Sequence, residues 1–106
     1  MTDKPLMEFI DRFSRRIKLT EERWNHIAKM HPELRDMLED LKGTLEYPEL
    51  IKRSVYNENV VLFYRYYAHI YEGKHMCVVV KHDEESIVTA YITDRIKKGE
   101  VVWKKN

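Results

Sequence analysis

The residue types in this chain that could do chemistry are histidine, arginine, lysine, threonine and tyrosine. An arginine can bind one phosphate group through two hydrogen bonds, and a lysine can stabilise negative charge that develops during a reaction. A histidine can accept or donate a proton near neutral pH, while a tyrosine ring can stack on a nucleic-acid base. Together these groups suit a phosphodiester, including RNA that is cleaved through its own 2′-hydroxyl, a reaction that needs no metal.

The candidates for these roles are spread along the chain. The histidines are expected as general acid or base, the arginine and lysine as phosphate contacts, and a threonine and a tyrosine as groups that line the site. In that order they are His26, His31, Arg65, Lys81, Thr89 and Tyr91.

Each candidate also has an ordinary structural explanation. Arg65 could pair across strands with an acid such as Glu72, and His31 could simply cap a helix. A tyrosine such as Tyr91 often packs with only its hydroxyl in water, and Thr89 is a common type of strand residue. Taken singly, the residues indicate no more than a small α+β domain.

The sequence contains no motif that is typical of a cofactor site or a metal site. Only three glycines are present, so no glycine-rich loop can cradle a phosphate, and no pair of cysteines and histidines has zinc-finger spacing. His26 and His31 are five positions apart, which places them about 140° apart around a helix and prevents them from sharing one face as metal ligands. We therefore expect no cofactor and no metal ion.

The sheet that would position the candidate residues is predicted from three runs of β-branched and aromatic residues. The runs cover residues 60–67, 75–81 and 87–93, and short polar connections between them favour an antiparallel meander. We expect Lys81 to lie opposite Ile87 and Tyr67 opposite His75, because this register separates an apolar face from a mixed one. The apolar face would carry Met76, Val78, Val80, Val88, Ala90 and Ile92. The mixed face would carry Val61, Phe63, Arg65, Tyr67, Cys77, Val79, Lys81, Ile87, Thr89, Tyr91 and Thr93.

Helical patterns precede these strands. An apolar stripe over residues 5–16 (Leu6, Phe9, Ile10 and Phe13) predicts a first helix, followed by a short strand at 17–19. Thr20 is expected to cap a helix that ends near Met30, and Pro32 to begin another that stops at Tyr47. We expect residues 48–54 to be irregular or a short helical turn, 55–56 to begin a strand, 57–59 to form a hairpin turn, and 101–103 to pack on the core.

These elements predict an α+β fold in a single domain spanning residues 1–106. N-terminal helices would cover one face of an antiparallel sheet of about four strands, leaving the other face partly open. The 106 residues suffice for one core, and the single cysteine, Cys77, reads as a small buried residue. We find no segment of membrane-spanning length or signal-peptide type, and expect a cytoplasmic protein.

The charge distribution gives only a weak indication of a partner. The formal net charge is +1, so the chain is not a strongly basic nucleic-acid binder. Basic residues nevertheless outnumber acidic ones after residue 50, with Arg95, Lys97, Lys98, Lys104 and Lys105 near the end of the chain. A solvated lysine-rich surface is the favoured explanation of this excess, and an anionic partner is the alternative.

Several segments in combination resemble a known family. They are residues 17–27 (IKLTEERWNHI), 31–34 (HPEL), 48–54 (PELIKRS), 63–67 (FYRYY), 78–81 (VVVK) and 87–93 (IVTAYIT). This pattern, over about residues 15–103, is similar to the phage-associated nuclease-like domains grouped with barnase, EndoU, the tRNA-cutting colicins and RelE (the BECR fold).

The resemblance implies a helix-then-sheet fold and metal-independent RNA cleavage of the kind found in toxin–antitoxin and phage-conflict systems. RNA would be the substrate, and a cognate antitoxin or immunity protein a further partner. The positions that match the family pattern are His26, His31, Arg53, Ser54, Arg65, Lys81, Thr89, Tyr91 and Thr93. We expect Tyr91, Thr93, Arg53 and Ser54 to bind the substrate, together with Tyr67 from the mixed face. The near-neutral charge departs from the strongly basic RelE-type toxins and argues against tight non-specific RNA binding.

Two classes of function stay open at this point. The ribonuclease hypothesis predicts that His31, Arg65, Lys81 and Thr89 converge in one cleft. A non-catalytic module that binds RNA or protein would keep Arg65 apart from the histidines and expose the tyrosine-rich strand at residues 60–67. That same tyrosine face could also be buried in a homodimer.

Overall fold

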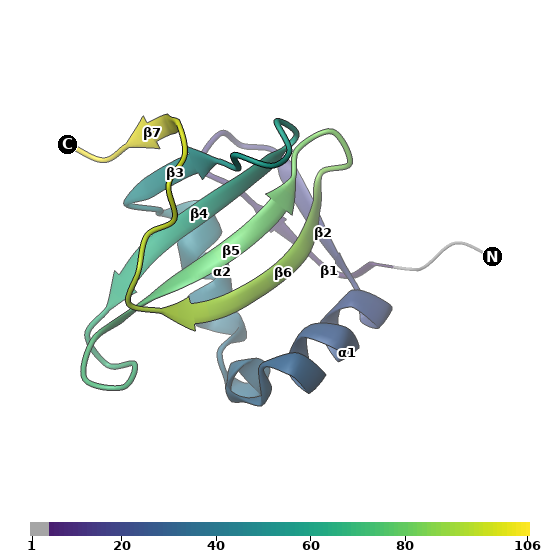
Figure 1. Ribbon diagram of the computed structural model, residues 1–106. Helices are drawn as coiled ribbons and strands as arrows, with labels where there is room; N and C mark the ends of the chain where they lie inside the picture. The colour runs from purple at the N-terminus through teal and green to yellow at the C-terminus, as the bar shows by residue number, and fades with distance from the viewer. Residues whose placement is uncertain (1–4) are drawn as a thin grey trace.

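A computed structural model describes residues 5–106 and the side chains from Met7 onward (Figure 1). The side chain of Leu6, part of the expected helical stripe, lies outside the described side chains. The elements are β1 (Pro5–Ile10), β2 (Arg16–Thr20), α1 (Glu21–Met30), the 3₁₀ helix η1 (Pro32–Asp36), α2 (Leu38–Glu46), β3 (Leu50–Arg53), β4 (Val60–Tyr67), β5 (Lys74–Lys81), β6 (Ser86–Thr93) and β7 (Val101–Lys104).

All of these strands join one mixed sheet. Its order is β1-β2-β6-β5-β4-β3-β7, and every pairing is antiparallel except the short contact of β2 with β6. The α+β class is therefore confirmed, but the expected number of about four strands is wrong, because the sheet has seven. The central meander β4-β5-β6 is confirmed.

The predicted register is right for β5 and β6 over most of their length. Cys77 lies opposite Tyr91 and Val79 opposite Thr89, as expected. Near the turn, a bulge shifts the pairing, so Lys81 lies opposite Ser86 rather than Ile87. The bulge turns Ile87 into the buried core, which corrects its expected place on the mixed face.

The predicted register of β4 is wrong by one residue. Tyr67 lies opposite Lys74 rather than His75, and Arg65 lies opposite Met76. Because side chains alternate across a strand, this shift moves Arg65 and Tyr67 to the face that the helices cover. The other face receives Leu62 and Tyr64 instead.

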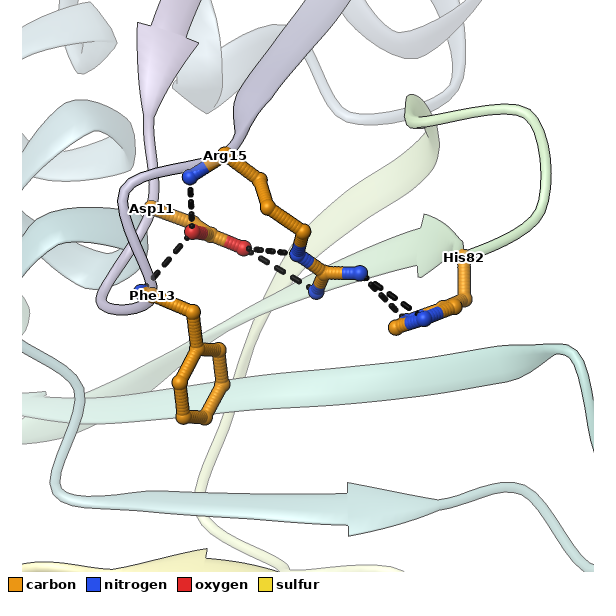
Figure 2. A network of polar contacts seen from close by, with 4 residues as sticks. All are labelled: Asp11, Phe13, Arg15 and His82. Atoms are coloured by element: carbon orange, nitrogen blue, oxygen red, sulfur yellow. Dashed lines mark hydrogen bonds and ion pairs between the residues drawn. The ribbon is translucent and has the colours of Figure 1, made fainter.

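The first predicted helix is wrong, because residues 5–10 form the edge strand β1. It pairs with β2 in a hairpin, so Phe9 is buried while Ile10 is largely exposed. The turn is built around the buried carboxylate of Asp11, which accepts hydrogen bonds from the backbone N–H groups of Phe13 and Arg15 (Figure 2). Local hydrogen bonding of this kind competes with a helix and ends β1 at the turn.

The two α-helices lie on the same side of the central strands (Figure 1). The Thr20 hydroxyl caps α1 by accepting from the Arg23 backbone N–H, and α1 ends at Met30 as expected. The second helix differs in detail, because Pro32 begins a 3₁₀ segment and α2 starts only at Leu38. Helix α2 stops before Tyr47-Pro48, as the sequence predicts.

The segments after α2 are more regular than expected. Residues 50–53 form β3, where an irregular or helical segment was predicted, because they pair with both β4 and β7. The expected strand start at Val55-Tyr56 is wrong, since these residues form an exposed bend. The turn at residues 57–59 is confirmed, with the Val60 N–H donating to the Asn57 carbonyl.

The sheet curves around a single apolar core beneath the helices. Residues of both helices pack there against Phe63, Met76 and Val78, which are fully buried. The curvature brings the two ends of the strand order together, since the guanidinium of Arg12 lies 5.0 Å from the ring centroid of Trp103 in β7. No helix of residues 5–106 covers the opposite face of β4, β5 and β6.

Candidate functional site

The helix-free face of the central strands carries a groove of about 570 Å³. Strands β4 and β5 supply its apolar floor, β6 supplies Thr89 and Tyr91, and two loops form its walls. One wall is the bend after β3, and the other is the segment between β6 and β7. The lining residues are Ser54, Val55, Tyr56, Val60, Leu62, Val79, Thr89, Tyr91, Lys97 and Lys98. Pockets of this size and character suit a small molecule or a few nucleotides.

Under the groove lies a small cluster of Leu62, Tyr64 and Cys77. The Tyr64 hydroxyl accepts a hydrogen bond of 3.1 Å from the backbone N–H of Lys97. This bond attaches the loop after β6 to the sheet face, so the lysines of the loop are held at the groove. Tyr64 therefore holds the loop in place at the groove, although it does not line the groove itself.

Burial dominates the acid–base properties of this cluster. Burial raises the pKa of the Cys77 thiol to about 11, and burial together with the Cys77 charge raises the pKa of Tyr64 to about 12. The same two causes raise the pKa of Tyr91. All of these groups are consequently neutral near pH 7, and the thiol is a poor nucleophile. The Tyr91 hydroxyl is buried and has no hydrogen-bond partner of ordinary geometry among residues 5–106.

Two basic side chains flank Tyr91. The ring centroids of His31 and Tyr91 are 6.2 Å apart, and the Lys97 Nζ lies 5.4 Å from the Tyr91 ring centroid. His31 occupies the corner where α1 ends and Pro32 begins η1, and its Nδ1 lies 3.9 Å from a carboxylate oxygen of Glu33. An imidazole and an ammonium group thus stand beside the same aromatic wall of the groove.

The remaining candidates on β5 and β6 have different surroundings. Lys81 forms an ion pair of 2.9 Å with Glu84, and this contact raises the pKa of the lysine. Thr93 is occupied in the loop, where its hydroxyl accepts from the Arg95 backbone N–H. Of these predicted residues, Thr89 is the one that lines the groove.

Arg65 and Tyr67 belong to the helix-covered side of the sheet. Arg65 donates a hydrogen bond of 2.6 Å to the carbonyl of Tyr47 and stacks on the Tyr67 ring. The Tyr67 hydroxyl donates to the Asp40 carbonyl in α2. It passes so close to Gly43 that a Cβ there would lie 2.9 Å from it, which explains a glycine in this helix. Both candidates therefore fix α2 to β4, and the structure separates them from the groove.

Adjacent residues at the end of β3 face different cavities. Ser54 lines the groove, whereas Arg53 lines a second cavity on the other side of the sheet. His26 is exposed on α1 and lines a small surface hollow with Thr20 and Arg23. The structure therefore brings together Ser54, Thr89 and Tyr91 at the groove, and His31 lies beside the Tyr91 ring without lining the groove.

Sequence reasoning missed Lys97 and Lys98 as site residues. Their charge was visible in the basic end of the chain, but the contact that holds them at the groove is made by Tyr64, 33 positions away in the sequence. It also missed Val55 and Tyr56, whose exposed bend forms a wall of the groove.

The arrangement offers proton transfer, positive charge and an aromatic wall. His31 could exchange a proton, Lys97 and Lys98 could neutralise a phosphate, and Tyr91 could contact a base. Within residues 5–106, no group of three or more histidine, cysteine or acidic side chains is placed to hold a metal ion. No helix in that part of the chain is long and apolar enough to cross a membrane.

Comparison with protein-family models, with curated proteins and with solved structures finds no match to this chain in any of the three.

Proposed function

We propose that the groove binds single-stranded RNA and that the protein is a ribonuclease that uses His31 for proton transfer. The observation that carries this proposal is the placement of His31 and Lys97 beside the Tyr91 ring, within 6.2 Å and 5.4 Å of its centroid. A proton-transfer group, a phosphate-neutralising group and a surface for a base are the parts that this reaction needs.

The proposed reaction takes place at one phosphodiester of the RNA. A base removes the proton of the 2′-hydroxyl, whose oxygen attacks the adjacent phosphorus. The bond from phosphorus to the 5′-oxygen breaks, and that oxygen takes a proton from water as it leaves, which yields a 2′,3′-cyclic phosphate and a 5′-hydroxyl. His31 serves as the proton acceptor, and Lys97 and Lys98 stabilise the charge on the phosphoryl oxygens.

The α+β class supports the family resemblance in part, although β1 and β2 precede the helices and the sheet has seven strands instead of about four. The feature shared with the expected fold is the pair of helices on one side of the sheet, and the groove lies on the opposite, open face. Under this proposal the partners are RNA and a cognate antitoxin or immunity protein, and the compartment is the cytoplasm. The expected convergence of His31, Arg65, Lys81 and Thr89 in one cleft is not found. Arg65 binds the Tyr47 carbonyl at the end of α2, and Lys81 pairs with Glu84. The proposed catalytic set is therefore His31 with Lys97 and Lys98.

A second candidate is an RNA-binding module without catalysis. It is favoured by the binding of Arg65 to the Tyr47 carbonyl and by the ion pair of Lys81 with Glu84, which leave fewer charged groups for a transition state. The apolar floor of Val60, Leu62 and Val79 also suits bases better than phosphates.

One experiment separates these candidates. Purified protein is mixed, in EDTA, with fluorescent single-stranded RNA of random sequence and with cellular RNA. Binding and cleavage are both measured. The proteins compared are the parent, His31→Ala and the double variant Lys97→Ala/Lys98→Ala. If the protein is a ribonuclease, the parent cleaves RNA and His31→Ala binds RNA without cleaving it. The double variant loses RNA binding.

Each other outcome has a definite meaning. Binding without cleavage by the parent selects the module. Cleavage that survives both sets of substitutions contradicts the proposed site, and RNA binding that is absent from a folded parent contradicts both candidates.

A further inference from the structure

A second cavity of about 440 Å³ opens on the side of the sheet opposite the groove. It lies between the β1–β2 turn and the strands β3, β4 and β7. Its wall is mainly apolar, with Phe13, Ile51, Val61, Phe63 and Val102, and its mouth carries Arg15, Arg53 and His82. None of these mouth residues takes part in the proposed RNA chemistry, so the cavity calls for a separate explanation.

Arg15 is held at the mouth by a buried acid. The side chain of Asp11 has no exposed surface, and its oxygens accept from two backbone N–H groups and from the Nε of Arg15, with Nη2 3.1 Å away (Figure 2). This pairing uses one edge of the guanidinium and fixes its direction. The remaining Nη1 points to His82, lying 2.7 Å from Nδ1 and 2.8 Å from Nε2.

Arg53 approaches the same mouth from the end of β3. Its Nε binds the Glu100 carboxylate at 3.0 Å, and its Nη1 donates to the Glu58 carbonyl at 2.9 Å. Glu100 is mostly exposed, and this arginine is its one ion-pair partner in the part of the chain that the structure describes. An incoming anion can therefore replace Glu100, whereas it cannot replace the enclosed Asp11.

The combination of an apolar wall with cationic donors on one side selects a class of ligand. An uncharged apolar molecule would make no use of the Arg53 edge that the exposed Glu100 occupies, and a simple inorganic anion would leave the apolar wall in water. We propose that this cavity binds a small organic anion, with its apolar ring against the exposed Phe13 and Val102 and its carboxylate or phosphate between Arg15, Arg53 and His82.

The test uses 2-naphthoate as the probe and its uncharged amide, 2-naphthamide, as the matched control. Binding to the whole ¹⁵N-labelled chain is followed by the backbone amide shifts, which locate the probe and give its affinity in one titration. A ligand of this size in a partly open site is expected to bind with a dissociation constant of about 1 mM. The expected shifts lie at Phe13, Val61, His82 and Val102.

Substitutions at the mouth should change the affinity in opposite directions. Arg53→Gln removes a charged donor and should weaken 2-naphthoate binding about tenfold. Glu100→Gln removes the competing carboxylate and should strengthen binding about threefold. Glu72→Gln makes the same change of charge in the β4–β5 turn, far along the sheet, and should leave the affinity unchanged.

Several results would overturn this assignment. They are equal binding of the amide and the carboxylate, shifts confined to Thr89, Tyr91 and Lys97, an unchanged affinity in Glu100→Gln, and the absence of shifts at ten times the expected dissociation constant. The spectrum of each variant shows whether it is folded, and Glu100→Gln alters an exposed side chain, so the test does not depend on Arg53→Gln alone.

Discussion

The imidazole of His31 and the phenol ring of Tyr91 lie with their centroids 6.2 Å apart and their planes tilted by 34°. His31 belongs to the corner between α1 and η1, whereas Tyr91 belongs to the middle of β6. The contact therefore places a residue of the helical layer at the edge of the groove on the helix-free face. His31 does not itself line the groove, and the Tyr91 ring is the groove residue beside which it lies.

If this contact marks a catalytic site, His31→Ala should lower the rate of RNA cleavage by at least about 100-fold, the usual contribution of a general base. RNA affinity should change little, because the lysines of the groove are retained. Initial rates and fluorescence anisotropy on the same RNA measure the two effects. His69→Ala, which removes an exposed histidine paired with Asp40, is the matched control. Equal rates for the two variants would exclude His31 from the chemistry.

Arg65 should be important for stability rather than for activity. Arg65→Ala removes the 2.6 Å hydrogen bond to the Tyr47 carbonyl and the stacking on Tyr67. The free energy of unfolding should fall by about 1 to 2 kcal/mol, measured by urea denaturation, because the bond has a charged donor. Arg95→Ala, at an exposed loop position, should change it by less than about 0.5 kcal/mol. A folded Arg65→Ala protein that no longer cleaves RNA would restore Arg65 to the site.

The sequence predicts some parts of this fold because local pattern decides them. In β5 and β6, apolar side chains alternate so regularly that only one parity leaves a dry face, and the predicted pairing of Val79 with Thr89 is correct. In β4, Leu62 and Tyr64 are as apolar as Val61 and Phe63, and all of them are buried. Both parities therefore look acceptable in the sequence, and the register is set by packing against α2.

The candidate site is less predictable for a related reason. Residues on β6, such as Thr89 and Tyr91, follow from the strand's own alternation. Lys97 reaches the groove only because its backbone N–H donates to the Tyr64 hydroxyl, a contact between distant segments. The β1–β2 hairpin is hard to predict for a similar reason. Asp11 stabilises its turn by accepting hydrogen bonds from two backbone N–H groups, and the apolar stripe in the sequence does not indicate these bonds.

Asp11 should be among the most sensitive polar positions in the chain. Asp11→Asn keeps the size of the side chain but removes the charge that pairs with Arg15 and strengthens two backbone hydrogen bonds. We expect a loss of about 2 to 3 kcal/mol in the free energy of unfolding, because the partner charge stays close to a buried site. Asp94→Asn, whose carboxylate is exposed beside Lys74, should cost less than about 0.5 kcal/mol. Similar losses for both would contradict a structural role for the Asp11 network.

Cys77 should make stability fall at alkaline pH. Burial raises the pKa of its thiol from 9.0 to about 11 in the folded state, so the unfolded chain loses this proton first. The contribution is fully present below pH 9.0 and declines as the pH rises toward about 11. Between pH 7 and pH 10, the free energy of unfolding of the parent should therefore fall by roughly 1 kcal/mol more than that of Cys77→Ala. Urea denaturation of both proteins across this range measures the difference, and parallel pH profiles would contradict it.

The two groove lysines should account for the salt dependence of RNA binding. A lysine that neutralises a phosphate releases a counterion, which adds about 0.7 to the slope of log affinity against log salt for a single strand. Lys97→Ala and Lys98→Ala should each reduce that slope by about this amount, and each should weaken binding several-fold at low salt. Lys42→Ala removes the same charge from the exposed side of α2, on the opposite side of the molecule, and should leave the slope unchanged. A slope that falls equally in all three variants would show that RNA responds to net charge alone, whereas a slope that falls only at Lys97 and Lys98 requires that phosphates lie in the groove.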